Sequence, residues 1–141
     1  MKSVFLDSSV LFTAANSPTG GSSKLFTLKK FKLVVSPLVL TETERNIRKK
    51  LQSYQLERFF KLVALTQIAD QKPDSRLVKN AKEVIEEKDS VILAEAKLAK
   101  CDFLVTLDKK DFLNKKVSNF LKPTTALTPK KLIELIKKKF R

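Results

Sequence analysis

Lys2-Ser-Val-Phe-Leu-Asp-Ser-Ser-Val-Leu-Phe12 is the segment from which the architecture of this chain can be inferred. Its apolar centre, Val4-Phe5-Leu6, is typical of a strand that is buried on both faces, as in a parallel sheet. The strand ends at Asp7, and the hydroxyls of Ser8 and Ser9 are suited to capping the free N–H groups that begin a helix. Ligands of open α/β sheets bind beyond the carboxyl ends of the strands, so we expect Asp7 at the ligand-binding edge.

A second segment with the same pattern is Phe103-Leu-Val-Thr-Leu-Asp108, and Asp111 follows it by one turn. Because the carboxyl ends of parallel strands meet at one sheet edge, two strands that each end in a carboxylate predict a cation site. The alternative is that each aspartate only caps the helix or turn that follows it. Asp102 lies at the opposite end of this strand and is therefore excluded from a shared site.

The composition is that of a globular protein. The chain has 141 residues, of which 43% are hydrophobic, so residues 1–141 are expected to form a single domain with its own core. A single cysteine, Cys101, excludes an internal disulfide, and the absence of histidine excludes His-based catalysis and the usual zinc sites. With no signal peptide and no membrane-length apolar run, we expect a cytoplasmic protein without membrane partners.

Positive charge is the strongest compositional signal. Lys and Arg number 29 against 15 Asp and Glu, which gives a net charge of +14 and favours a polyanionic partner such as nucleic acid. The alternative is a lysine-rich solvated surface, and the few aromatic residues among the charges give little signal for base stacking. The candidate nucleic-acid contacts are Arg45, Arg48, Lys49, Lys109 and Lys110.

Strand-like and helix-like segments alternate along the chain, without internal repeats or linkers. Strands are predicted at 4–6, 33–35, 103–107 and 122–127, with 66–69 an ambiguous edge strand. Helices are predicted at 10–15, 23–30, 37–51, 55–65, 75–85, 91–99 and 130–140, and loops at 16–23 and 114–121. This alternation predicts a three-layer α/β/α sandwich around a mostly parallel sheet of about five short strands.

The predicted helix at 91–99 is almost wholly apolar and should therefore be central. Asp89 and Ser90 precede it, and Asp89 is suited to the N-cap position. A helix this buried should hold its N-terminus at a fixed place beside the sheet edge, which makes Asp89 a candidate for the cation site as well. Glu42 lies in the first turns of the helix that follows Ser36-Pro37, where an acid is favourable in any protein.

Four segments together resemble the motifs of PIN-domain proteins. They are Val-Phe-Leu-Asp7-Ser-Ser-Val-Leu-Phe, Val-Ser36-Pro-Leu-Val-Leu-Thr-Glu42, Asp89-Ser-Val-Ile-Leu-Ala-Glu-Ala and Phe-Leu-Val-Thr106-Leu-Asp108-Lys-Lys-Asp111-Phe. Each motif is unspecific, but their order and spacing fit over nearly the whole chain. The resemblance implies a Mg²⁺- or Mn²⁺-dependent nuclease that acts most often on RNA. Many relatives are VapC-type toxins that a cognate antitoxin neutralises and that often form homodimers, so these are the implied partners.

The resemblance also assigns site residues by position. The implied catalytic and metal-binding acids are Asp7, Glu42, Asp89 and Asp108, with Asp111 as a fifth ligand or as the alternative to Asp108. Ser9 stands where the family commonly has Asn, so its contact with the first acid can differ. Ser8 and Thr106 are candidates to orient a ligand or a water, although buried hydroxyls more often bond the backbone. Hard divalent cations prefer such oxygen ligands, and clustered carboxylates repel one another without a cation.

Two other classes of protein remain as alternatives. Phosphoryl-transfer enzymes of the haloacid dehalogenase type also begin with a strand and an Asp. They need a second acid two residues later, where this chain has Ser9. The other alternative is a non-catalytic PIN-like module that binds nucleic acid or protein, against which the intact set of acids argues.

Overall fold

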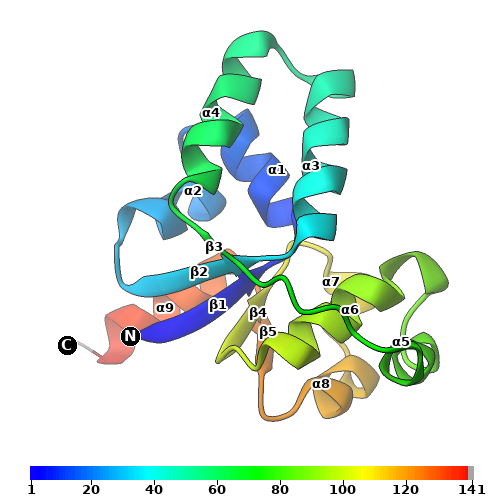
Figure 1. Ribbon diagram of the computed structural model, residues 1–141. Helices are drawn as coiled ribbons and strands as arrows, with labels where there is room; N and C mark the ends of the chain where they lie inside the picture. Colours follow the sequence, from blue (N-terminus) through cyan, green and yellow to red (C-terminus); the bar gives the residue numbers. More distant parts are fainter. Residues whose placement is uncertain (140–141) are drawn as a thin grey trace.

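A parallel β-sheet organises the molecule, as seen in a computed structural model that describes residues 1–139 (Figure 1). The described strands are β1 (Lys2–Leu6), β2 (Phe31–Val35), β3 (Gln67–Ile68), β4 (Phe103–Val105) and β5 (Thr125–Leu127). They lie in the order β3-β2-β1-β4-β5, and each neighbouring pair is parallel. The chain fills the sheet outward from β1 in both directions, so the strand order reverses between β1 and β4. Open α/β sheets bind their ligands outside the carboxyl ends of the strands at this kind of reversal.

Helices cover both sides of this sheet, which makes the predicted three-layer α/β/α sandwich correct. In Figure 1 the helices α1 to α4 lie on one side of the strands and α5 to α8 on the other. The helices are α1 (Ser8–Asn16), α2 (Gly21–Thr27), α3 (Pro37–Lys50), α4 (Ser53–Val63), α5 (Ser75–Lys82), α6 (Glu87–Ala99), α7 (Lys109–Phe112), α8 (Lys115–Leu121) and α9 (Pro129–Lys139). None of the helices in the described part is long and apolar enough to cross a membrane.

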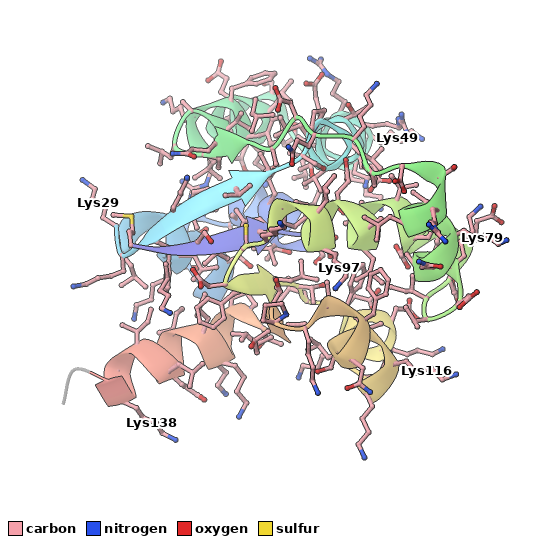
Figure 2. All side chains as sticks on the ribbon, turned by 60° about the horizontal axis from the view of Figure 1, so that its bottom comes forward. Lys29, Lys49, Lys79, Lys97, Lys116 and Lys138 are labelled. Atoms are coloured by element: carbon pink, nitrogen blue, oxygen red, sulfur yellow. The ribbon has the colours of Figure 1, made fainter. Side chains whose placement is uncertain are left out.

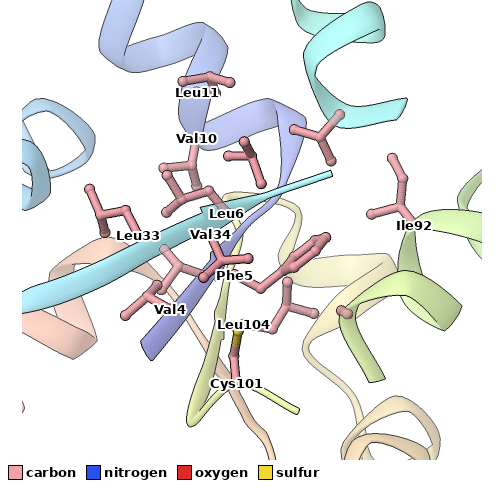
Figure 3. Packing of buried hydrophobic residues seen from close by; sticks show 14 of the residues in the cluster. Val4, Phe5, Leu6, Val10, Leu11, Leu33, Val34, Ile92, Cys101 and Leu104 are labelled. Atoms are coloured by element: carbon pink, nitrogen blue, oxygen red, sulfur yellow. The ribbon is translucent and has the colours of Figure 1, made fainter. Parts of the chain in front are cut away.

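The central strand β1 is buried on both faces, as its sequence predicts. Val4, Phe5 and Leu6 have no exposed surface. Successive side chains of a strand point to opposite faces, and Figure 3 shows Phe5 directed towards Ile92 of α6 while Leu6 points towards Val10 of α1. Both helix layers are therefore fixed against the strand that ends in Asp7.

The helix next to the site, α6, is buried along most of its length. Ile92, Leu93, Ala94 and Ala96 are at most 2% exposed. The helix begins at Glu87 with Glu86 as the N-cap residue, so Asp89 does not have the alternative role of N-cap and lies inside the first turn. The predicted central position of this helix agrees with its burial.

Two local predictions, the capping by Ser8 and Ser9 and the loop at 114–121, are wrong. Ser8 and Ser9 do not cap α1, because the helix begins at Ser8 with Asp7 at the N-cap position. The predicted loop at 114–121 contains helix α8, whose first turn is capped by Asn114 through a 3.0 Å hydrogen bond from the N–H of Val117. The two lysines at its start and the polar pair Ser118-Asn119 interrupt the apolar residues of this helix, of which Val117 and Leu121 are buried.

The remaining differences concern the ends of elements. The last strand starts at Thr125 rather than 122, since Pro123 has no N–H to give to a strand ladder. The ambiguous segment 66–69 does contain an edge strand, β3, which pairs with β2 through Val34 and Val35.

Candidate metal centre

Asp7 is the residue around which the candidate site is built. It follows β1 directly and is only 4% exposed. Its Oδ2 accepts two hydrogen bonds, one of 2.8 Å from the Ser9 hydroxyl and one of 2.9 Å from the Thr106 hydroxyl. Its Oδ1 has a single weak contact, with the Ser8 hydroxyl at 3.5 Å. The carboxylate is thus held through one oxygen, and the other is the less engaged of the two.

The hydroxyls that hold Asp7 also fix the chain beyond β4. The Ser9 hydroxyl accepts a hydrogen bond of 3.1 Å from the N–H of Leu107, and the Thr106 hydroxyl accepts one of 3.0 Å from the N–H of Asp108. The carboxyl ends of β1 and β4 are therefore connected by side chains as well as by the strand ladder. The sequence singled out Ser8, Ser9 and Thr106 near this position, and all three contact Asp7.

Glu42 and Asp89 approach Asp7 from opposite helix layers, and their pKa values record the crowding. Burial raises the pKa of Glu42, and the charge of Asp7 raises it further against the opposing charge of Arg45. Burial likewise raises the pKa of Asp89 to about 6, with further contributions from the charges of Asp108, Asp111 and Asp7 and an opposing one from a neighbouring lysine. The charges of Glu42 and Asp89 therefore each interact with the charge of Asp7.

Asp108 and Asp111 lie side by side at the start of α7. The N–H of Asp111 donates a 3.1 Å hydrogen bond to Oδ1 of Asp108, so Asp108 is the N-cap of this short helix. The capping interpretation of Asp108 is thus correct. Partial burial, followed by the charges of Asp108 and Glu86, raises the pKa of Asp111.

Glu86 is an acid of this region that the sequence motifs do not identify. One carboxylate oxygen from each of Glu86, Asp89 and Asp111 lies within 4.8 Å of the other two. Oδ2 of Asp89 is buried and has no hydrogen-bond partner among the described residues. The signal in the sequence was the spacing of three residues between Glu86 and Asp89 across a helix start, which puts both on one side of the first turn.

Glu95 is a second acid without a predicted role. It is 9% exposed, and its Oε1 accepts a 2.8 Å hydrogen bond from the Ser36 hydroxyl, which also caps α3 by accepting from the N–H of Val39. Burial raises the pKa of Glu95, the Ser36 hydrogen bond opposes this, and the charge of Glu42 adds to it. Glu95 is the single acid within the largely apolar segment 91–99, and this was the available signal. Glu95 ties α6 to the start of α3, the helix that carries Glu42.

The basic residues predicted to contact nucleic acid lie on both sides of the acids. Arg45 lies close enough to Glu42 to lower its pKa, and Arg48 pairs with Glu44 at 3.1 Å. Lys109 and Lys110 are exposed on α7, next to Asp108. Lys49 projects from α3, but Figure 2 shows lysines on every side of the molecule. The positive charge is therefore distributed widely, and only part of it borders the acids.

The donor set fits a hard divalent cation. All the acidic ligand candidates offer oxygen, which Mg²⁺ and Mn²⁺ prefer. The raised carboxyl pKa values and the unpartnered carboxylate oxygen of Asp89 fit such a site, because a dication reverses the repulsion between the acids.

Fold and site together define an α/β protein with an acidic centre at the strand-order reversal of a parallel sheet. The family model described as "PIN domain" matches residues 4–117. The chain belongs to the PIN-domain family, as its four motifs predicted. A search of curated proteins found no match.

Several solved structures share the fold at low sequence identity. PAE2754 from Pyrobaculum aerophilum is 15% identical, with a TM-score of 0.65 and 96% of each chain covered. VapBC2 from Rickettsia felis, bound to a promoter DNA fragment, is 16% identical, with a TM-score of 0.64, 89% of this chain and 98% of that chain covered. VapC20 from Mycobacterium tuberculosis, a sarcin-ricin loop cleaving toxin, is 16% identical, with a TM-score of 0.56, 76% of this chain and 91% of that chain covered.

The raised pKa of Asp89 predicts that Asp89→Asn stabilises the protein at pH 7 when no divalent cation is bound. A carboxyl whose pKa rises from 3.8 to about 6 on folding stabilises the fold below pH ~4, and this contribution is lost as the pH rises through 6. Asn at this position does not ionise and therefore avoids that loss. We expect the free energy of unfolding of Asp89→Asn to exceed that of the wild type by on the order of 1 kcal/mol at pH 7, allowing for solvent screening. At pH 4 the two proteins should have the same free energy of unfolding. Urea unfolding in EDTA measures both, and an equal difference at the two pH values would contradict the electrostatic explanation.

Proposed function

We propose that this chain is a divalent-metal-dependent endoribonuclease, that residues 1–141 form a single PIN-like nuclease domain, and that it acts as the toxin of a toxin–antitoxin pair. The observation that carries the proposal is the buried, oriented carboxylate of Asp7 within a group of acids, one of which has an unpartnered oxygen. Membership of the PIN-domain family supports it, and so do the neighbours of known activity. VapC20 is a toxin that cleaves the sarcin-ricin loop.

The cation would be Mg²⁺ or Mn²⁺. The proposed catalytic and ligand residues are Asp7, Glu42, Asp89 and Asp108, with Asp111 as a further ligand, and the arrangement of acids adds Glu86 to this set. When bound, such a cation offsets the negative charge of a phosphate and makes a water more acidic. The chain has no histidine, so carboxylates are the groups available to take up a proton near neutral pH.

In this proposal some residues position the acids and others take part in proton transfer. Ser9 and Thr106 hold one oxygen of Asp7 and leave the other directed to the site. Glu95 and Ser36 fix the N-terminus of α3 against α6, which sets the position of Glu42. Glu42 and Asp89 reach Asp7 from the two helix layers, and whichever of the two does not bind the cation is the candidate to accept a proton from an attacking water.

The proposed partners follow from the same assignment. RNA is the substrate, and Arg45, Arg48, Lys49, Lys109 and Lys110 bind its backbone. An antitoxin is the proposed protein partner, because two of the structural neighbours are VapBC complexes, from Rickettsia felis and Salmonella typhimurium, that include one. We also propose a homodimer and a cytoplasmic location, where RNA is available.

Asp7→Asn tests the proposed chemistry. The substitution keeps the size of the side chain and its ability to accept from Thr106, and it removes the charge that would bind a cation. We expect cleavage of single-stranded RNA in Mg²⁺ or Mn²⁺ to fall by at least about a hundredfold, while RNA binding changes little. Measurement of cleavage with gel-resolved oligonucleotides, and of binding by fluorescence anisotropy, separates the two effects.

The matched control is Asp102→Asn. Asp102 lies at the amino end of β4, where it accepts a 2.9 Å hydrogen bond from the N–H of Ser3 that Asn can also accept. Activity should stay near wild type. An equal loss in both variants would indicate damage to the fold, and full activity of Asp7→Asn in a nuclease-free preparation would refute the mechanism.

Glu86→Gln tests whether the missed acid binds the cation. Loss of one oxygen ligand from a hard-cation site weakens binding, so we expect the dissociation constant for Mn²⁺, measured by titration calorimetry, to rise at least about fivefold. Glu87→Gln is the control, because Glu87 is next in sequence and, like Glu86, pairs with a lysine, but it is not a member of the group of Glu86, Asp89 and Asp111. Unchanged Mn²⁺ affinity in Glu86→Gln would remove Glu86 from the set of ligands.

The charge of the surface predicts a salt-dependent affinity for RNA. Because bound phosphates release their counterions, affinity should fall about tenfold or more between 50 and 200 mM salt. The double variant Lys109→Gln/Lys110→Gln should reduce this slope, whereas Lys138→Gln should not. Lys138 lines a groove with Lys2, Phe31 and Phe103 at the amino ends of the strands, far from the acids. A flat salt dependence would show that the +14 charge has no part in RNA binding.

A further inference from the structure

A cleft of about 420 Å³ opens beside Asp7, between α1 and α3. Its lining includes Ser8 and Ser9, whose hydroxyls contact the carboxylate of Asp7, so the cleft borders the acidic centre directly. The volume falls within the range of clefts that bind small molecules. This cleft had no part in the function proposed above.

The two helices present matched rows of side chains along the cleft. On α3, residues four apart lie on one face, and Glu42, Asn46 and Lys50 form such a row from the acids outward. On α1, Phe12 lies one turn beyond Ser8 and Ser9, and it also lines the cleft. The row that begins with a proposed metal ligand, Glu42, therefore continues into a cleft with an aromatic wall.

The cleft offers both the face and the edge contacts that an unpaired base needs. Phe12 is partly exposed, and Lys50 Nζ lies 6.0 Å from the centre of its ring. Leu107, which is 41% exposed, adds a second apolar surface. Aromatic side chains of this kind stack on bases of single-stranded nucleic acid, and a nearby cation strengthens the contact with a phosphate.

Asn46 supplies polar recognition. Its amide has donors and an acceptor, and in the described part of the chain it makes no hydrogen bond. An Asn amide can bond the polar edge of a base, and it discriminates between bases because their donor and acceptor patterns differ. The alternative for Asn46 is an ordinary solvated amide. Its place between Glu42 and Lys50, facing an aromatic ring across a cleft, favours the recognition role.

We propose that this cleft binds one unpaired base of single-stranded RNA, next to the phosphodiester bond that the acids act on. Phe12 stacks on the base, Asn46 bonds its edge and Lys50 binds the adjoining phosphate. This inference rests on the proposed ribonuclease function. It makes Phe12 and Asn46 determinants of the cleavage site. A base held in a duplex would not enter, because its face is stacked and its edge is paired.

The test combines cleavage of an oligonucleotide panel with a binding readout. The panel varies one base at a time around the site that the wild-type full-length protein cuts. We expect Asn46→Ala to reduce the preference for the favoured base about tenfold, and Phe12→Leu to raise KM several-fold while leaving the salt dependence of binding unchanged. The matched controls are Asn80→Ala on α5 and Phe60→Leu on α4, both exposed in the structure. Neither control should alter preference or KM.

Binding is measured separately with oligonucleotides that carry 2-aminopurine at successive positions, using the Asp7→Asn background. Stacking on Phe12 should quench the fluorescence at one position, and Phe12→Leu should remove that quenching. Thermal unfolding verifies that each variant is folded. If Phe12→Leu does not fold, Asn46→Ala, which changes a side chain on the surface of α3, tests the proposed base site alone.

The possible outcomes separate the two proposals. The base site is refuted, and the ribonuclease proposal is kept, if the wild type cuts RNA and either of two results is found. These are that Asn46→Ala keeps the base preference, or that Phe12→Leu still quenches the fluorescence. If the wild type quenches at one position but never cuts, the ribonuclease is refuted and the base site stands. If Phe12→Leu changes only the oligomeric state, as measured by light scattering, the cleft belongs to an interface between two copies and the proposal is overturned.

Discussion

The hydrogen bond between the Thr106 hydroxyl and Oδ2 of Asp7, 2.9 Å long, is the interaction on which the arrangement of the site depends. It joins the carboxyl ends of β1 and β4 at the place where the strand order reverses. Ser9 makes a parallel connection, since its hydroxyl donates to Asp7 and accepts from the N–H of Leu107. Both hydroxyls therefore act as donor and acceptor together. These hydrogen bonds fix the position of the Asp7 carboxylate at the end of β1. The other acids are arranged around it.

Packing of the helix layers keeps these like charges together despite their repulsion. Asp89 projects from the first turn of α6, a helix whose apolar residues are almost fully buried, so it cannot withdraw without opening the core. Glu42 is similarly constrained, because Ser36 both caps α3 and bonds Glu95 of α6. Burial and the neighbouring negative charges raise the pKa values of both acids, and hydrophobic packing of the helices offsets this unfavourable electrostatic free energy. Clusters of this type are more common at functional sites than elsewhere in a fold.

The sequence predicted those parts of the molecule that depend on short-range pattern. The buried strands, the sheet edge and Asp7 followed from apolar runs that end in an acid. Glu86 and Glu95 were missed because their roles depend on which helices pack together, and sequence spacing alone does not give that. Helix α8 was missed because its burial comes from contacts with distant elements, while its own composition is basic and polar. Conversely, the scarcity of aromatic residues gave no reason to single out Phe12, whose importance arises from the helix that faces it.

The distribution of charge imposes a final constraint on how such a protein can meet RNA. A net charge of +14 attracts a polyanion from a distance, yet the centre of the proposed site is a group of carboxylates that repels a phosphate at close range. The basic residues that border the acids do not cancel this repulsion, since the pKa of Glu42 stays raised although the charge of Arg45 opposes the rise. Binding of the RNA backbone and entry of the scissile phosphate are therefore separate requirements. The first depends on the basic surface, and the second on neutralisation of the acids. A base held in the cleft beside Asp7 would connect these two requirements. It would hold the adjoining phosphate next to the acids once the negative charge of the acids is neutralised.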